Sequence, residues 1–209
     1  MDKNISNIFN DIEVIVKIKE RLPYLFQLAE MECSRAGKVG MGVGSLREKI
    51  ILALLIYLFG EENVKTDIPI TASEIDVEVF DNPISIKTIT GRNITGIKLI
   101  WTVDSESAQK FKNSYNPDYD LLLINIVWNG TGNFYYIPSE VQKEVFNKIG
   151  RENYIKLPKT GTNPRGVEMS KEAIDKILNH QSIKKILIDW NRTKIDYHPY
   201  ERWIEYWKD

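Results

Sequence analysis

The order of apolar and polar residues predicts helices at the start of the chain. Apolar residues recur at helical spacing over residues 8–20 and 24–36, and Pro23 is expected to break the helix between them because proline lacks a backbone donor. A third, mostly apolar helix is predicted over residues 46–59. We therefore expect an N-terminal helical region, 1–36, followed by one buried helix.

The pattern changes to alternation over residues 73–90, which predicts two short strands joined at Asp81-Asn82-Pro83. Side chains of a strand alternate between faces, and directly opposed residues of an antiparallel pair point the same way. A loop of two or four residues would place Glu78 opposite Lys87 and bring Asp76 to the same face as Lys87. A three-residue loop would place Asp76 and Lys87 on opposite faces. The hairpin therefore presents an acid beside a lysine, or it forms a solvated sheet surface in which acids face lysines.

The rest of the chain alternates between strand and helix patterns. The run over residues 121–128 is almost continuously apolar, which predicts a central strand covered on both faces. These patterns predict an α/β (α+β) fold in one domain, 1–209, with a central mixed sheet flanked by helices and a helix-plus-strand core at 46–103. Further strands are expected at 97–103, 133–137 and 183–188, and further helices at 105–115, 139–149 and 170–179.

Composition limits the chemistry that the chain can support. Its 209 residues include one cysteine, Cys33, and two histidines, which argues against a disulfide framework, a His/Cys zinc site and a histidine-activated nucleophile. The 28 basic and 29 acidic residues are balanced, so a general nucleic-acid coat is not indicated, whereas basic groups gathered in one cleft are compatible with this balance. No apolar run of membrane-spanning length and no signal-peptide pattern is present, so a cytoplasmic protein without a membrane partner is expected.

A glycine-rich loop, 37–44, precedes the apolar helix. Its glycines allow a sharp turn or a close backbone approach, and Met41 is the large, flexible apolar side chain at its centre. Met41 either covers the core or reaches outward to a ligand. Ser45 and Glu48 form a capping-box pattern at the start of the helix. Alternatively, Glu48 points at the hairpin and supplies a second carboxylate.

Two polar loops and an aromatic C-terminal segment are further candidates for binding. Arg92 and Asn93 lie in a turn after the hairpin, and Lys159 and Arg165 lie in a later loop. Such loops are plain surface, or they contact phosphates and base edges. Aromatic residues recur through 197–208, a spacing more typical of a terminal helix docked on the core or on a second subunit than of a base-stacking surface.

Glu48, Asp76 and Lys87 together form a candidate catalytic site. A helix carrying Glu48 runs into a hairpin carrying Asp76 and Lys87, and this arrangement resembles the PD-(D/E)xK nuclease superfamily. The resemblance implies a core of one helix and a three-stranded meander, in which Asp76 binds a metal and Lys87 is the motif lysine. The sequence departs from the usual motif, since Ser85 replaces its second acid and Ile75 its proline. Variants of this superfamily take the missing acid from the preceding helix, where Glu48 lies.

A literal Pro-Asp occurs at Pro117-Asp118, but it follows the core and has no lysine at the required spacing, so we interpret it as incidental. The segment from Gly40 to Lys87 is similar to the type II restriction enzyme ThaI and its relatives, which cut the sequence CGCG. It shares their Gly-Met-Gly loop, helix acid, E-x-D strand and S-x-K strand. The similarity implies a Mg²⁺-dependent enzyme, with Mn²⁺ as a substitute and Ca²⁺ or Na⁺ as inactive replacements. Glu48, Asp76 and the backbone carbonyl of Ile86 would hold the metal, and Lys87 would contact the attacking water.

The same similarity implies a homodimer that cuts double-stranded DNA at a palindrome to blunt ends, with a cognate DNA methyltransferase acting on the same site. It also implies that Met41 enters the base stack from the minor-groove side; CG is a pyrimidine–purine step, which unstacks readily, and apolar wedges are known minor-groove devices. Two other functions stay open: a structure-specific or repair nuclease of the same superfamily, like a Holliday-junction resolvase, and a non-catalytic DNA-binding module with a decayed site. The predicted DNA contacts are Met41, Gly40, Gly42, Lys38, Arg92, Asn93, Lys159 and Arg165.

Overall fold

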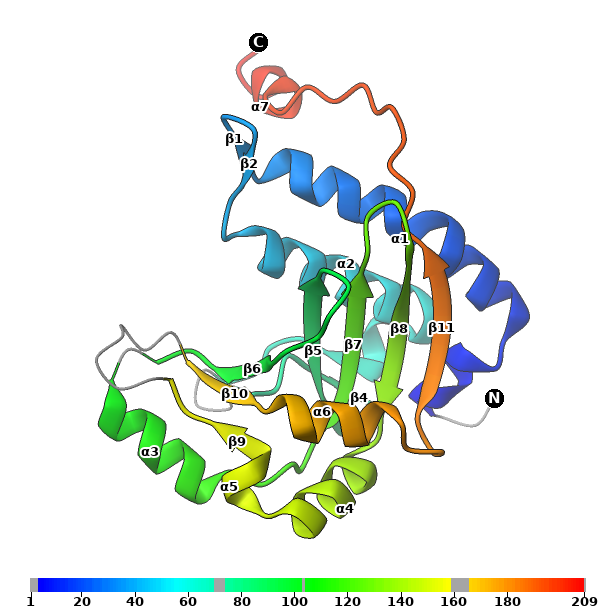
Figure 1. Ribbon diagram of the computed structural model, residues 1–209. Coiled ribbons are helices and arrows are strands. Elements are labelled where there is room, and N and C mark those ends of the chain that lie inside the picture. The colour runs from blue at the N-terminus through cyan, green and yellow to red at the C-terminus, as the bar shows by residue number, and fades with distance from the viewer. Residues whose placement is uncertain (1–3, 70–73, 103, 159–165, 209) are drawn as a thin grey trace.

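The centre of the computed structural model is a six-stranded mixed sheet with strand order β11-β8-β7-β5-β4-β3 (Figure 1). The structure describes the chain except for residues 1–3, 70–73, 103, 159–165 and 209. In this sheet β5 and β7 pair in parallel, and the other neighbouring strands pair antiparallel. Its strands are β3 (Val64–Lys65), β4 (Val77–Val79), β5 (Asn82–Thr90), β7 (Asp120–Ile126), β8 (Thr131–Ile137) and β11 (Lys184–Asp189).

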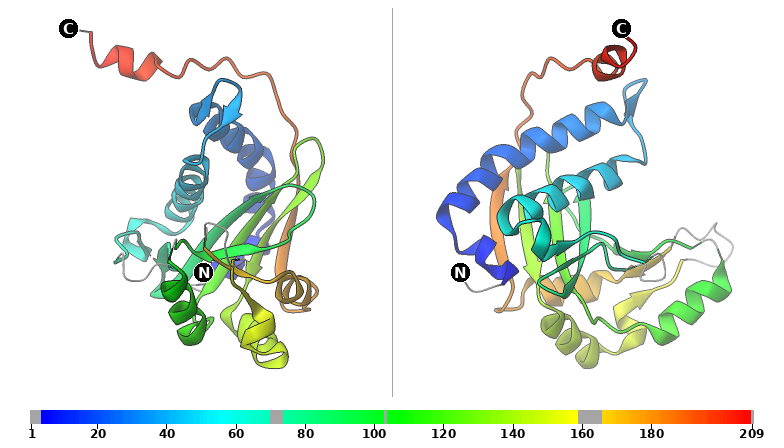
Figure 2. Two further views of the ribbon diagram at one scale, coloured as in Figure 1. Left: turned by 60° about the vertical axis from the view of Figure 1, so that its left-hand side comes forward. Right: turned by 180° about the vertical axis from the view of Figure 1, so that it is seen from behind.

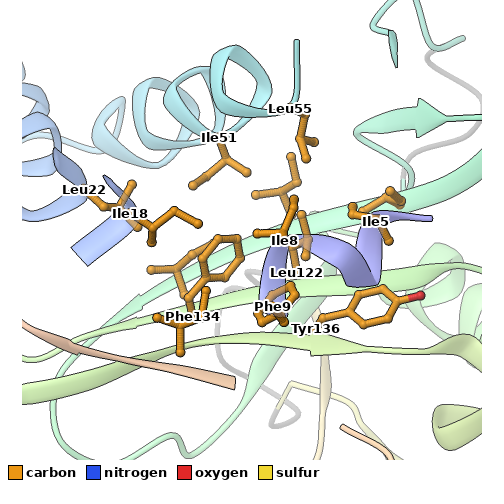
Figure 3. Packing of buried hydrophobic residues seen from close by; sticks show 14 of the residues in the cluster. Ile5, Ile8, Phe9, Ile18, Leu22, Ile51, Leu55, Leu122, Phe134 and Tyr136 are labelled. Carbon is orange, nitrogen blue, oxygen red and sulfur yellow. The ribbon is translucent and has the colours of Figure 1, made fainter. Parts of the chain in front are cut away.

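Two long helices cover one face of the sheet (Figure 2). They are α1 (Ile12–Glu32) and α2 (Val43–Phe59), and a short 3-10 turn, η1 (Ile5–Phe9), packs beside them. A second 3-10 turn, η2 (Glu61–Asn63), follows α2. Figure 3 shows how their apolar side chains meet those of the sheet in one buried cluster, which includes Ile18, Leu22, Ile51, Leu55, Leu122 and Phe134.

The opposite face carries shorter elements and a second buried cluster. Its helices are α3 (Ser105–Ser114), α4 (Ser139–Ile149), α5 (Arg151–Tyr154) and α6 (Lys171–Leu178). A three-stranded sheet of order β6-β10-β9 lies beside them (Figure 1). Its strands are β6 (Ile97–Ile100), β9 (Ile155–Lys156) and β10 (Val167–Met169).

Strand β7 explains why the central run is apolar on both sides. Leu122 and Ile124 belong to the cluster under α1 and α2, whereas Leu121 and Leu123 belong to the cluster on the opposite face. Successive side chains of a strand point to opposite faces, so a strand covered on both sides is apolar at successive positions. The predicted fold class, a central mixed sheet flanked by helices, is confirmed.

The N-terminal helices differ from the expectation. Helix α1 runs without interruption through Pro23, so the predicted break is wrong. Pro23 is buried in the same stretch as Leu22 and Phe26, and this packing offsets the roughly 3 kcal/mol that an internal proline costs a helix. The helix ends at Glu32, and the short antiparallel strands β1 (Ser34–Arg35) and β2 (Lys38–Val39) follow it.

The start of α2 and the hairpin also differ from the expectation. Helix α2 begins after its N-cap residue Gly42, which places Glu48 inside the helix and makes the capping-box interpretation wrong. The hairpin turn is Phe80-Asp81, because Val79 pairs with Asn82. Both turn residues have positive φ, 51° and 64°, which suits a two-residue turn between twisted strands.

This register has two consequences. It places Glu78 opposite Pro83, so the prediction that Glu78 opposes Lys87 is wrong. It also continues to Asp76, whose backbone N–H donates to the carbonyl of Ile84 at 2.9 Å. The condition for Asp76 and Lys87 to share a face, a loop of two residues, is therefore met.

The last residues of the chain leave the body of the molecule. They form an extended segment and the short helix α7 (Glu201–Glu205), in which no residue is buried (Figures 1 and 2). The interpretation that this aromatic segment docks on the core is wrong. None of the helices in the described ranges combines the length and apolar content that a membrane-spanning helix needs.

Candidate active site

A carboxylate and a lysine meet where β4 and β5 pair. Asp76 immediately precedes β4, and its Oδ2 lies 3.0 Å from Nζ of Lys87. The same oxygen accepts hydrogen bonds from the backbone N–H of Ile86 at 2.6 Å and from the hydroxyl of Ser85 at 3.2 Å. Three donors on one strand thus fix the Asp76 carboxylate against β5.

The edge of β5 beside this contact is open. Strand β7 pairs with β5 from Ile84 to Thr90, whereas β4 pairs with it only at Asn82–Ile84 in the described part of the chain. The N–H of Ile86 points to this open edge, since it donates to Asp76. In an extended strand the N–H and C=O of one residue point to the same side, so the Ile86 carbonyl oxygen also points there.

Glu48 reaches the same place from α2. Burial raises the pKa of the half-buried Glu48 carboxyl above its ordinary value, the nearby charge of Asp76 raises it further, and Lys87 partly opposes the shift. The two carboxylates therefore repel each other across a partly desolvated site. Such a pair favours either a shared proton or a bound cation.

Glu48, Asp76 and Lys87 line one cavity of about 640 Å³. The cavity lies between the N-terminal part of α2, strand β5 and strand β6. Within the described residues no group of three or more His, Cys, Asp and Glu side chains is placed to hold a metal ion. The oxygen atoms that could hold a divalent cation in this cavity include the carboxylates of Glu48 and Asp76 and the carbonyl of Ile86. These are oxygen ligands, the kind that Mg²⁺ and Ca²⁺ prefer.

The glycine-rich loop borders this cavity. Met41 is 95% exposed and lines the cavity, so the interpretation that Met41 covers the core is wrong. The backbone N–H of Gly40 donates to the carbonyl of Cys33 at 2.9 Å, and a Cβ on Gly40 would lie only 2.9 Å from that oxygen. Glycine is therefore required at this position for the turn that presents Met41.

A buried ion cluster holds α2 in position. Glu30 of α1 pairs with Arg47 and Arg192 and accepts a hydrogen bond from Nε1 of Trp128 at 2.7 Å. Arg47 also donates to Oγ1 of Thr90 at 3.1 Å. The residue before Glu48 is thereby tied to the last residue of β5, the strand that carries Lys87.

Not all predicted DNA contacts are gathered here. Lys38 and Gly42 lie beside Met41 on the exposed segment between α1 and α2. Arg92 and Asn93 instead line a different cavity of about 540 Å³, against α6, which shares no lining residue with the first. Lys159 and Arg165 lie outside the described residues.

Trp101 and Lys98 are cavity residues that sequence reasoning missed. The Lys98 ammonium lies 3.6 Å from the centre of the exposed Trp101 ring, and both residues line the cavity with Glu48 and Asp76. The alternating pattern assigned Trp101 to a strand over 97–103, but β6 ends at Ile100. An aromatic residue next to a lysine-bearing strand was the available signal.

The sequence model described as "Restriction endonuclease ThaI" matches residues 8–209. The chain belongs to the ThaI restriction endonuclease family. A solved structure titled "Restriction endonuclease in complex with substrate DNA" superposes on this ThaI-family chain with a TM-score of 0.92, at 54% sequence identity, covering 97% of this chain and 98% of that one. No curated protein sequence matches the chain. The resemblance that the sequence suggested is confirmed at the level of the family.

Proposed function

We propose that this ThaI-family chain is a type II restriction endonuclease that hydrolyses double-stranded DNA within a short palindrome, CG/CG, and leaves blunt ends. The contact between Asp76 and Lys87, with Glu48 in the same cavity, is the observation that carries the proposal. It is supported by the 54% identity, across nearly the whole chain, to a restriction endonuclease solved with its substrate DNA. A metal-dependent phosphodiesterase needs such a set of oxygen ligands and a cation beside the phosphate.

The cofactor in this proposal is Mg²⁺, with Mn²⁺ as a substitute and Ca²⁺ or Na⁺ as inactive replacements. When bound, it supplies a water of lowered pKa and neutralises charge on the phosphate. Glu48 and Asp76 hold it with the Ile86 carbonyl. Burial and, after it, the charge of Asp76 raise the pKa of Glu48, so protonation of Glu48 would compete with metal binding at these carboxylates.

Lys87 has a different role in the proposal. Its ammonium is held 3.0 Å from the Asp76 carboxylate, so the side chain is oriented before DNA arrives. From this position it donates to the attacking water and to a non-bridging oxygen of the scissile phosphate. Orientation of this kind removes an entropic cost from the reaction.

Met41 is proposed to read the CG step by entering the base stack from the minor-groove side. Its side chain is exposed at the mouth of the cavity that holds the carboxylates. Opening a base step costs a few kcal/mol, and pyrimidine–purine steps are the easiest to unstack. A homodimer would present two such loops to the two halves of a palindrome, and a methyltransferase of the same specificity would protect the host DNA.

The test is to incubate the purified chain with plasmid DNA, with Mg²⁺ or with EDTA, and to map the ends of any fragments. We expect blunt ends within CGCG, formed only with the metal. Lys87→Ala and Asp76→Asn should each lower the cleavage rate by at least about a hundredfold. Lys65→Ala and Glu78→Gln are matched controls, because Lys65 of β3 and Glu78 of β4 form an ion pair that does not line the cavity.

The outcomes separate the parts of the proposal. Equal loss of activity in the control variants would show that strands β3 and β4 tolerate no change and that the contact between Asp76 and Lys87 has no special role in cleavage. Discrete cuts at another sequence would keep the catalytic residues and refute the CGCG specificity. Cleavage of branched DNA alone would indicate a junction enzyme, and metal-independent binding without cleavage would indicate a decayed site.

A further inference from the structure

The last part of the chain is tethered to the body at one point and then leaves it. Trp190 is fully buried, and the side chain of Gln27 exchanges two hydrogen bonds with the backbone of Thr193, at 2.6 and 2.9 Å. Residues 194–208, here called the C-terminal arm, project beyond this anchor (Figures 1 and 2). The arm touches the end of α1 again through an ion pair between Arg202 and Glu32 at 3.0 Å.

The arm carries an apolar stripe. Tyr200, Trp203, Ile204 and Trp207 follow one another at the i, i+3, i+4, i+7 spacing that places side chains on one face of a helix. The backbone there is helical in the turn α7, and hydrogen bonds from Ile204 to Tyr200 and from Trp207 to Ile204 continue it on both sides. Tyr200, Trp203 and Trp207 are 65%, 51% and 88% exposed.

The charge of the arm indicates what kind of partner covers this stripe. Its basic residues Lys194, Arg202 and Lys208 are matched by Asp196, Glu201 and Glu205. A surface that binds DNA phosphates gains its affinity from an excess of Lys and Arg, and the arm has none. An apolar stripe between balanced charges is instead typical of a helix that lies in a protein groove.

We propose that the C-terminal arm docks on a second copy of this chain, so that two arms are exchanged about a two-fold axis. The inference rests on the homodimer of the proposed function and names the element that forms it. The exposed area of the stripe fits a second copy of the chain. At about 200 Å² for each aromatic side chain, the exposed parts of Tyr200, Trp203 and Trp207 offer about 400 Å² per arm. Two arms with the surfaces they cover then bury about 1,600 Å², the size of a specific and stable interface.

The second copy has exposed apolar residues to receive an arm. On the outer surfaces of α1 and α2, Tyr24, Leu25 and Tyr57 remain exposed. The Arg202–Glu32 ion pair places the arm beside the β1–β2 hairpin, which leads directly to Met41. An exchanged arm would therefore join the two copies next to the loops that we propose enter the DNA.

The test compares the full-length chain with Trp203→Ala/Trp207→Ala and with Tyr206→Ala by sedimentation equilibrium, without DNA or metal. Tyr206 is an exposed aromatic of the same turn that is outside the i, i+3, i+4, i+7 set, and its ring centre lies 6.3 Å from that of Trp203, so Tyr206→Ala tests whether the stripe itself is needed rather than any aromatic residue of the arm. We expect a dimer for the parent and for Tyr206→Ala, and a dimer dissociation constant at least about tenfold higher for the double variant. The folded content of all three chains should agree by circular dichroism, because the changed residues are exposed.

Three results would overturn the inference. These are a monomeric parent at all concentrations tested, a double variant that dimerises as tightly as the parent, and a control that loses as much affinity as the double variant. If the double variant keeps its dimer but loses affinity for DNA, the arm is a DNA-binding element and the inference fails. Cleavage by the parent is measured separately. A wrong assignment of the dimer contact to the arm can therefore be distinguished from a wrong assignment of nuclease activity.

Discussion

Glu30→Gln should destabilise the fold far more than its size suggests. Glu30 and Arg47 are both buried, and they pair at the junction of α1, α2 and β5. Burial lowers the pKa of Arg47 from its ordinary value, and the charge of Glu30 opposes this shift. The amide of Gln keeps the shape of the side chain and an acceptor for Trp128, but it removes the charge that compensates the guanidinium.

The magnitude follows from the burial of Arg47. Removing one partner of a buried pair leaves an uncompensated charge, which costs about 3–5 kcal/mol. Arg192 adds little, since its side chain is partly exposed and can be solvated. For a chain of 209 residues, each kcal/mol lowers the melting temperature by about 2–4 °C, so the expected fall is about 6–20 °C.

The assay is thermal unfolding followed by circular dichroism or calorimetry. Glu106→Gln is the matched control, because Glu106 forms an exposed i,i+4 pair with Lys110 at 2.8 Å. Exposed helical pairs contribute about 0.3–0.5 kcal/mol, so this variant should melt within about 2 °C of the parent. A second variant, Glu30→Gln with Arg47→Met, removes the guanidinium and fills its space with an apolar chain, and it should regain most of the lost stability.

Two results would refute this reasoning. A Glu30→Gln chain that melts within about 2 °C of the parent would show that the Glu30 charge does not stabilise Arg47. A double variant no more stable than Glu30→Gln would show that the loss arises from something other than the unpaired charge of Arg47, such as the contacts of Glu30 with Trp128 and Arg192.

Two further predictions concern the proposed site. The raised pKa of Glu48 makes the folded chain bind its proton more tightly than the unfolded chain, so its contribution to stability is complete below pH 4.5 and is lost as pH rises through the raised pKa. In EDTA, Glu48→Gln should therefore raise the melting temperature at neutral pH but not below pH 4.5; an equal shift at both pH values would contradict the cause assigned here. With Mg²⁺, the same variant should lose cleavage. Met41→Ala should leave the melting temperature unchanged, because Met41 is 95% exposed, and should weaken cleavage of CGCG by at least about tenfold. Val39→Ala, on the adjacent hairpin, is its control, and equal activity of Met41→Ala and the parent would exclude insertion.

The layered fold could be predicted because its hydrophobic pattern is strong. The apolar run of β7 and the helical spacing of α4 and α6 each correspond to buried residues in the structure. Proline and glycine were less informative, because their local preferences compete with packing. Pro23 lies inside α1, where the buried side chains around it outweigh its helix-breaking tendency.

The candidate site was predictable in its residues but not in its register. Asp76 and Lys87 could be brought together only by a turn of suitable length, and the residues of the actual turn, Phe80 and Asp81, carry no Gly or Asn-Gly signal. The position of Trp101 at the cavity could not be predicted for a similar reason. An alternating pattern does not show where a strand stops, and β6 ends one residue before Trp101. Contacts that depend on where an element ends are therefore the least accessible to sequence reasoning.

The end of pairing between β4 and β5 is what makes the chemistry possible. Had β4 continued along β5, its backbone would have taken the N–H of Ile86 and covered the neighbouring carbonyl. Because pairing stops at Ile84, the Asp76 carboxylate accepts that N–H instead, and the carbonyl stays directed at the cavity. Glu48 of α2 lines the same cavity, so a helix places a second carboxylate there although the strand has Ser85 in place of an acid. The departure from the usual motif is thus compatible with the same oxygen-rich site.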